Sequence, residues 1–145
     1  MHFRTQIPVP KSNFPIDYDA RIVSLGSCFA ENIGAKLDYF KFCNETNPFG
    51  IIFNPVSLDK VLRRCLELDF YTEGDVFFHN ERWNCYEVHS ERSNADKEEF
   101  LFQLNQTVKR MHQQLQAASH CIITLGTAWV YRHLESGEIV ANCHK

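Results

Sequence analysis

The sequence predicts an α/β fold with a mostly parallel sheet, and three features of the chain point to it. A mostly apolar run over residues 21–25 stops at a glycine, and apolar residues then recur at helical spacing over 29–40. The continuous apolar run 121–125 also stops at a glycine, and it is typical of a parallel strand buried on both faces. Between these runs, residues 57–69 and 94–118 show the periodicity of amphipathic helices.

Capping residues set the expected helix boundaries. Ser57 is expected to cap the helix that continues to about Asp69. Asn94 or Asp96 is expected to cap the longest helix, which continues to about Ala118. One face of this longest helix is apolar, so we expect it to pack against the sheet.

The other segments carry weaker signals. Residues 1–20 are punctuated by proline and aspartate, and their apolar side chains predict that the segment packs on the body of the protein: Phe3, Ile7, Val9 and Phe14. Residues 42–43 predict a short second strand, and 44–55 predict a loop rich in asparagine and proline. Two β-hairpins are expected, the first of them as an insertion in the fold: 76–78 with 83–86, and 130–133 with 138–141.

A side chain capable of nucleophilic attack stands at the first strand-to-helix corner. Gly26 stands two residues before Cys28, and Ala30 stands two residues after it. This spacing matches the G-x-S-x-G nucleophile elbow, with Cys in place of Ser and Ala in place of the second Gly. Unpaired N–H groups and the helix dipole favour a thiolate there and also favour an acyl-transfer oxyanion. Cys28 is the candidate nucleophile and Ser27 the second candidate, although the Ser27 hydroxyl could instead cap the helix. The alternative is a capped helix with a buried thiol.

Two more residues are candidates for the same site. Strands that end in glycine at one edge of a parallel sheet meet where α/β proteins bind their ligands, so we expect Cys28 and Thr127 to share a site. His89 follows the first predicted hairpin and is a candidate base for Cys28, or a group that orients substrate. The alternative for His89 is a polar surface loop ahead of a helix.

The pentapeptide Gly26–Ala30 is the signature that names the GSCFA domain family, and the chain resembles this family from about Arg4 to its last residue. Three further pieces, in the same order along the chain, are similar to that family: Asn47–Gly50 with Asn54–Pro55, His89–Ser90, and Thr124–Thr127 with Trp129.

The GSCFA family resembles the SGNH/GDSL hydrolases, which implies a three-layer α/β/α sandwich that cleaves esters with a Ser-His-Asp arrangement. On this alignment Cys28 takes the place of the nucleophilic serine and Ser27 that of the aspartate beside it. Gly50 matches the glycine whose N–H contributes to the oxyanion hole. The alternative interpretation of Gly50 is that it only forms a turn in the loop. Ala128 stands where an oxyanion asparagine is usual, so Thr127 or its N–H is expected to substitute.

The Asp-x-x-His block that ends the superfamily domain has no counterpart, because His144 has no aspartate three residues earlier. The resemblance therefore implies that residues 1–145 are the N-terminal portion of a single, truncated GSCFA domain. A His-Asp pair beyond residue 145 is expected to supply the base, and the portion alone is expected to be inactive.

The leading functional expectation is an ester hydrolase or acyltransferase. Cys28 attacks an ester or thioester carbonyl, and the N–H groups of Cys28 and Gly50, with Thr127 nearby, stabilise the oxyanion. The alternative is a non-catalytic module that holds a glycan or an acylated small molecule at the same edge, and the absent oxyanion asparagine favours it. In either case the expected partner is a small molecule.

Composition excludes several other classes. The net charge is −3 without a basic stripe, which argues against nucleic acid, and the longest apolar run is too short for a membrane span. Without a secretory leader we expect a cytoplasmic protein, with its six widely spaced cysteines reduced. His120-Cys121 and Cys143-His144 are adjacent pairs, which do not chelate metal, so neither metal nor cofactor is expected.

Overall fold

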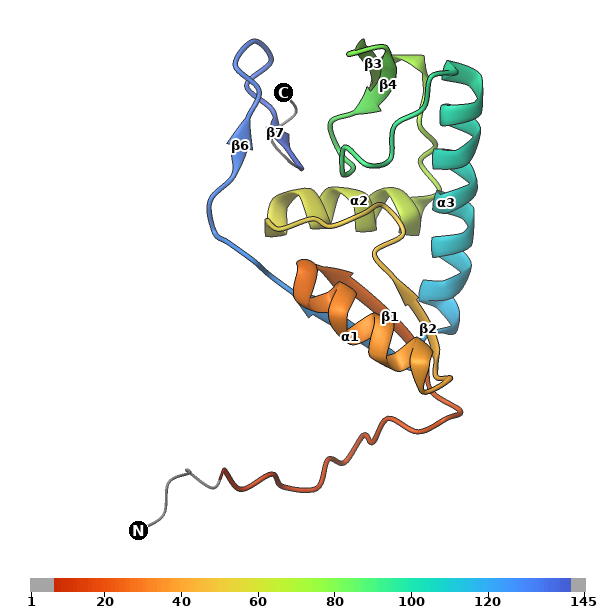
Figure 1. Cartoon of the computed structure of the whole chain (residues 1–145), viewed down its shortest axis with the longest axis vertical. Helices are drawn as coiled ribbons and strands as arrows, with labels where there is room; N and C mark the ends of the chain where they lie inside the picture. The colour runs from red at the N-terminus through yellow and green to blue at the C-terminus, as the bar shows by residue number, and fades with distance from the viewer. Residues whose placement is uncertain (1–6, 142–145) are drawn as a thin grey trace.

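The computed structural model describes residues 7–141 and builds them around a small parallel sheet (Figure 1). Three strands form it in the order β2-β1-β5, with β1 at the centre. Both neighbours run parallel to β1, so the α/β prediction is confirmed. The sheet strands and the helices are β1 (Arg21–Gly26), α1 (Cys28–Tyr39), β2 (Cys43–Thr46), α2 (Pro55–Glu67), α3 (Lys97–Ala117) and β5 (His120–Thr124).

Helices lie on both faces of the sheet. Side chains alternate along β1: Val23 and Leu25 enter the main core with residues of α2 and α3, and Ile22 and Ser24 therefore point to the other face. Helix α1 packs on β1 and β2, and a Cβ atom at Gly34 would collide with the Thr46 side chain. This close approach explains why the middle of α1 carries a glycine.

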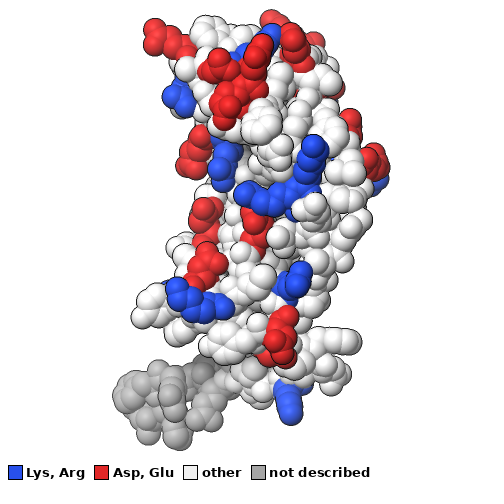
Figure 2. All heavy atoms as spheres, turned by 90° about the vertical axis from the view of Figure 1, so that its right-hand side faces the viewer, with Lys and Arg blue, Asp and Glu red and all other residues white. Residues whose placement is uncertain are grey.

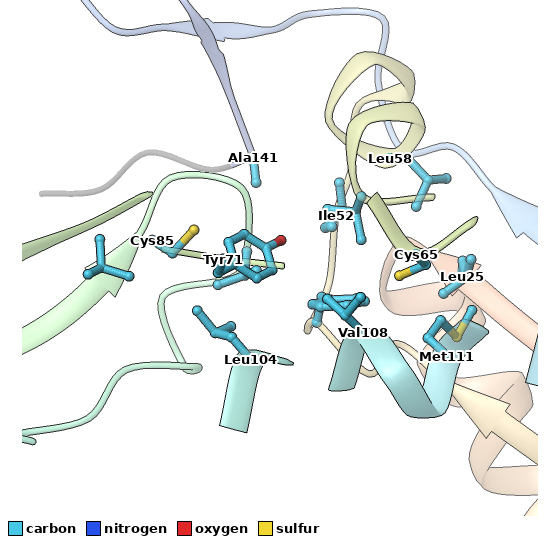
Figure 3. Close-up of a cluster of buried hydrophobic side chains, with 14 of the residues drawn as sticks. Leu25, Ile52, Leu58, Cys65, Tyr71, Cys85, Leu104, Val108, Met111 and Ala141 are labelled. Carbon is cyan, nitrogen blue, oxygen red and sulfur yellow. The ribbon is translucent and has the colours of Figure 1, made fainter. Parts of the chain in front are cut away.

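The main core lies between α2, α3 and the sheet. One stripe of α3 is buried at the spacing its sequence predicts: Phe100, Leu104, Val108 and Met111. In Figure 3, Met111 and Val108 lie beside Cys65 of α2 and Leu25 of β1, so three elements distant in sequence share one apolar cluster. The longest helix packs against the sheet as predicted.

Both predicted hairpins are present. Strand β3 (Val76–His79) pairs with β4 (Arg82–Cys85) across a two-residue turn whose residues both have positive φ, which suits the twist of a hairpin. A short 3₁₀ turn, Glu73–Asp75, precedes β3. Strand β6 (Tyr131–Arg132) pairs with β7 (Ile139–Val140), and the N–H of Ala141 bonds to the Tyr86 carbonyl, which ties the second hairpin to the first.

The prediction that the run 121–125 is buried on both faces is wrong. Cys121, Ile123 and Leu125 are exposed, the last two by 49% and 56%. Within residues 7–141, β5 pairs only with β1, and α2 and α3 cover Val23 and Leu25 without extending over β5. Burial of this strand therefore depends on its neighbours rather than on its own composition.

The prediction for the N-terminal segment is also wrong. Ile7, Val9 and Phe14 are 78%, 88% and 82% exposed, and Figure 1 shows the segment extending away from the sheet and helices. Phe3 lies outside the described residues. Prolines at 8, 10 and 15 hold this stretch extended, where its apolar side chains find no surface.

The described surface carries charges of both signs. On the face seen in Figure 2, acidic and basic side chains alternate over short distances. None of the helices between residues 7 and 141 has the length and apolar character that spanning a bilayer requires.

The cap of α2 is Asn54 rather than the expected Ser57. The Asn54 side chain accepts a hydrogen bond from the Ser57 N–H at 2.8 Å and donates toward the carbonyls of Val140 and Ala141. The Ser57 hydroxyl is buried and has no hydrogen-bond partner within residues 7–141.

Replacing these two residues should therefore have unequal effects. We expect Asn54→Ala to destabilise the protein by about 2 kcal/mol, because a helix cap and two buried carbonyl contacts are lost. Ser57→Ala should cost less than about 0.5 kcal/mol, because it removes a hydroxyl that lacks a partner. Urea unfolding followed by circular dichroism measures both, and equal losses would contradict the assignment of the cap.

Candidate functional site

The loop between β2 and α2, residues 47–54, is called the edge loop below. It crosses the carboxyl edge of the sheet and joins the ends of β1 and β5. At β1, the N–H groups of Asn47 and Ile52 donate to the carbonyls of Ser24 and Gly26 at 2.9 and 3.0 Å. At β5, the N–H of Gly126 donates to the Phe53 carbonyl at 3.0 Å. The pieces of sequence that resemble the GSCFA family thus meet at one edge, where α/β proteins place their ligands.

The first strand turns into α1 through a conformation that requires glycine. Gly26 has φ +122°, and a Cβ atom there would collide with the carbonyl oxygen of Thr124. The same carbonyl accepts the Ser27 N–H at 2.9 Å, so the corner is closed against the end of β5.

Ser27 has the capping role. Its hydroxyl accepts from the Phe29 N–H at 3.3 Å and lies 3.0 Å from the Thr124 hydroxyl, and the residue is 7% exposed. Both contacts hold the hydroxyl inside the corner, as the capping alternative for Ser27 expects.

Cys28 is exposed at the first position of α1. Its carbonyl accepts a hydrogen bond from the Asn32 side chain at 2.9 Å. Within residues 7–141 its N–H makes no hydrogen bond, as is usual for the first N–H groups of a helix. Cys28 is therefore accessible, and its own backbone N–H is an uncommitted donor. The alternative in which the thiol is buried does not describe this residue.

Gly50 lies in a turn, and its N–H is committed. With φ +80°, it donates to the Asn47 carbonyl at 2.8 Å, so this N–H is not aimed at a substrate. A Cβ atom at Gly50 would collide with the Cβ of His89, and the His89 N–H donates to the Phe49 carbonyl. The structure thus brings Gly50 and His89 into contact.

The His89 ring is directed into its own loop. Its Nδ1 accepts from the Glu91 N–H at 3.2 Å and lies 3.7 Å from the Glu91 carboxylate. No hydrogen bond joins the ring to Cys28 within residues 7–141. The ring is therefore bonded within its own loop, while the His89 Cβ lies at the Gly50 turn.

Thr127 stands just past the end of β5, near the corner. Its N–H donates to the Phe53 carbonyl at 3.3 Å, and its hydroxyl accepts from the Trp129 N–H at 3.0 Å. Trp129 itself is 87% exposed. Thr127 is therefore placed at the expected edge, with both of its polar groups engaged by the chain.

Asn47 is the site residue to which sequence reasoning assigned no role. It is 2% exposed, its Oδ1 accepts from the Gly26 N–H at 2.8 Å, and its Nδ2 donates to Glu31 at 3.1 Å. Its position in the Asn-Pro-Phe-Gly piece was the available signal. Sequence cannot show that its amide reaches back across twenty-one residues to the corner.

The other described cysteines differ from Cys28 in their surroundings. Burial raises the pKa of the Cys65 and Cys85 thiols to about 12, and burial also raises the pKa of Cys121. Cys43, at the opposite end of the sheet, is exposed, and all five described cysteines are free thiols. Cys143 and His144 lie outside the described residues. Among residues 7–141, no three or more His, Cys, Asp or Glu residues gather in a way that would hold a metal ion.

A small hollow lies beside the edge loop. It measures about 150 Å³ and is lined by both polar and apolar side chains. The lining residues include Phe49, Phe100, Leu104, Arg92, Ser93 and Gln103. The loop that closes the corner of β1 therefore also forms one wall of this hollow.

Comparison with known proteins identifies one family. The model of the GSCFA family matches residues 21–145, which begins at β1 and includes the corner, the edge loop and the end of β5. No curated protein matches the chain. No solved structure matches it either. The match covers most of the chain, and the chain belongs to the GSCFA family.

Proposed function

We propose that this chain is the nucleophile-bearing portion of an SGNH-type acyl hydrolase or acyltransferase, and that Cys28 is its nucleophile. The observation that carries the proposal is the exposed Cys28 thiol at the first position of α1, directly after a corner that only glycine can form. The resemblance to the SGNH first block supports the same residue. The substrate class is a small-molecule ester or thioester.

The proposed reaction is acyl transfer through a thioester. The Cys28 thiolate donates an electron pair to the carbonyl carbon, a C–S bond forms, and the carbonyl electron pair moves onto oxygen. When this intermediate collapses, the bond to the alcohol or thiol breaks, and the leaving group takes a proton from water. Water or another acceptor then attacks the thioester and gives its proton to the hydroxide left by the first step; the C–S bond breaks, and the acyl product and the thiolate are released.

Of the expected oxyanion donors, the Cys28 N–H alone is uncommitted within residues 7–141. The N–H groups of Gly50 and Thr127 are already bonded within the chain. We assign the Cys28 N–H and the positive end of the α1 dipole to the oxyanion. A thiolate needs no base at the moment of attack, which suits a site where no histidine between residues 7 and 141 bonds the nucleophile.

A second candidate function is a non-catalytic binding module. It is favoured by the committed N–H groups of Gly50 and Thr127, which leave fewer oxyanion donors than an efficient acyl-transfer site uses. The exposed ring of Trp129 offers a stacking surface for a sugar, and the hollow beside Phe49 offers a small cavity. On this candidate Cys28 would have ordinary reactivity.

Acylation by p-nitrophenyl acetate separates the two candidates. We expect one equivalent of acetyl on Cys28, formed about ten times faster than on exposed Cys43, because the Cys28 N–H at the helix N-terminus stabilises the oxyanion. Cys28→Ala should abolish the fast release of p-nitrophenol, and Cys43→Ala should leave it unchanged. The measurement is p-nitrophenol release with mass spectrometry of the labelled peptides.

Buried Cys65 and Cys85 serve as internal references, because their raised pKa of about 12 keeps them protonated near neutral pH. Equal acetylation of Cys28 and Cys43 would refute the nucleophile and favour the binding module.

A further inference from the structure

The buried side chain of Asn47 connects the two ends of the Cys28 corner. On one side its Oδ1 accepts from the N–H of Gly26, the last residue of β1. On the other side its Nδ2 donates to the carboxylate of Glu31, in the first turn of α1. Cys28 lies between these two partners in sequence, so one amide spans the nucleophile position.

Asparagine meets three demands at this position. Its φ is +41°, a left-handed conformation that asparagine and aspartate tolerate better than most residues. The Gly26 N–H requires an acceptor and the Glu31 carboxylate requires a donor, and the carboxamide of asparagine supplies both from separate atoms. At 2% exposure, losing either bond leaves a polar group poorly solvated.

Glu31 lies one helical turn after Cys28 on α1. The two residues are three apart on α1, which makes them neighbours on the helix surface. A carboxylate in the first turn stabilises the helix, but negative charge close to a thiolate opposes its formation. The bond to Asn47 holds this carboxylate at the β2 side of the corner, where it meets the edge loop.

We propose, resting on the function proposed above, that Asn47 is the positioning residue for Cys28. Its amide holds the Gly26 turn closed and anchors the Glu31 carboxylate, and so sets the position and the charge environment of the nucleophile. Asn47 acts through Gly26 and Glu31 and does not itself touch the substrate.

An exchange of donor and acceptor tests the proposal. Asn47→Asp keeps the tolerated φ and the acceptor for Gly26 but sets a second carboxylate against Glu31. Adding Glu31→Gln restores the bond in reverse, with the amide at position 31 donating to the carboxylate at position 47. We expect iodoacetamide to label Cys28 about fivefold more slowly in the single variant and within roughly twofold of the original rate in the double variant.

Asn105→Asp is the matched control. Asn105 also accepts from one backbone N–H and donates to one carbonyl, both of Tyr71, but it lies on α3 away from the corner. Its replacement should lower the urea midpoint and leave the Cys28 labelling rate unchanged. Labelling of each peptide is followed by mass spectrometry on the full chain.

The outcomes are distinct. The proposal is supported if Cys28 labelling is slow in Asn47→Asp and returns to near the original rate when Glu31→Gln is added. It is also supported if Asn47→Asp alone fails to fold while the double variant folds and has the original labelling rate. A double variant as impaired as the single variant overturns it, and so does an unchanged rate in the folded single variant. If Cys28 in the original chain reacts no faster than Cys43, the proposed function itself fails, whatever Asn47 does.

Discussion

Gly26→Ala should destabilise the protein by about 4 kcal/mol or more, a large part of the stability of a domain of this size. Two independent effects combine. The φ of +122° is one that L-residues rarely adopt, and the added Cβ would collide with the Thr124 carbonyl oxygen. Because that oxygen accepts the Ser27 N–H, relief of the collision must also open the junction of β1 with β5.

Gly137→Ala is the matched control. Gly137 also has positive φ, +72°, but a Cβ atom there meets nothing within 4 Å. Only the conformational cost remains, about 1 kcal/mol. Urea unfolding followed by circular dichroism compares the two variants. Similar losses would show that the contact with Thr124 does not constrain the corner.

Arg64→Ala should be the second most damaging of these changes, at about 3 kcal/mol. Arg64 is an α2 residue whose side chain is 11% exposed and binds Glu87 with two nitrogens, at 2.9 and 3.2 Å. It also pairs with Asp69 and Asp75, and its guanidinium lies 4.1 Å from the centre of the Tyr71 ring.

The reason for the large effect is the charge left behind. Burial opposes the charge on Arg64, but the hydrogen bond and charge of Glu87, together with the charges of Tyr71 and Asp75, outweigh it and hold the pKa of Arg64 above its ordinary value. Without the guanidinium, the partly buried carboxylates of Glu87 and Asp75 face each other without a cation. We expect faster hydrogen exchange in the β3–β4 hairpin as well as a lower urea midpoint.

Arg63 offers a control at the neighbouring position. Its side chain is 68% exposed and pairs with Asp59 one turn away, an arrangement that contributes little in water. Arg63→Ala should leave the midpoint nearly unchanged and hairpin exchange unaffected. Equal midpoints for the two variants would mean that the Arg64 cluster does not hold the hairpin to α2.

The corner at Cys28 could be predicted from sequence because its signals are local. A strand-like run, a glycine and an amphipathic segment determine a strand-to-helix turn within about ten residues, and the structure has β1, Gly26 and α1 in those places. The family pieces also meet at one edge, because parallel strands bring their carboxyl ends together.

The polar groups of the site could not be predicted in the same way. Gly50 and Thr127 lie at the expected edge, but whether their N–H groups face a ligand depends on which carbonyl lies opposite, Asn47 for one and Phe53 for the other. The same holds for the His89 ring, which bonds within its own loop. These hydrogen-bond partners depend on how the edge loop folds across the sheet.

The sequence by itself determined the alternation of strands and helices, the two hairpins and the strand-to-helix turn that carries Cys28, because periodicity and glycine act over a few residues. Tertiary structure alone decided that Ile123 and Leu125 are exposed, that the Asn54 amide reaches the end of β7, and that Asn47 joins Gly26 to Glu31. The physical reason is that burial and hydrogen-bond partnership belong to pairs of segments distant in the chain, so no single segment encodes them.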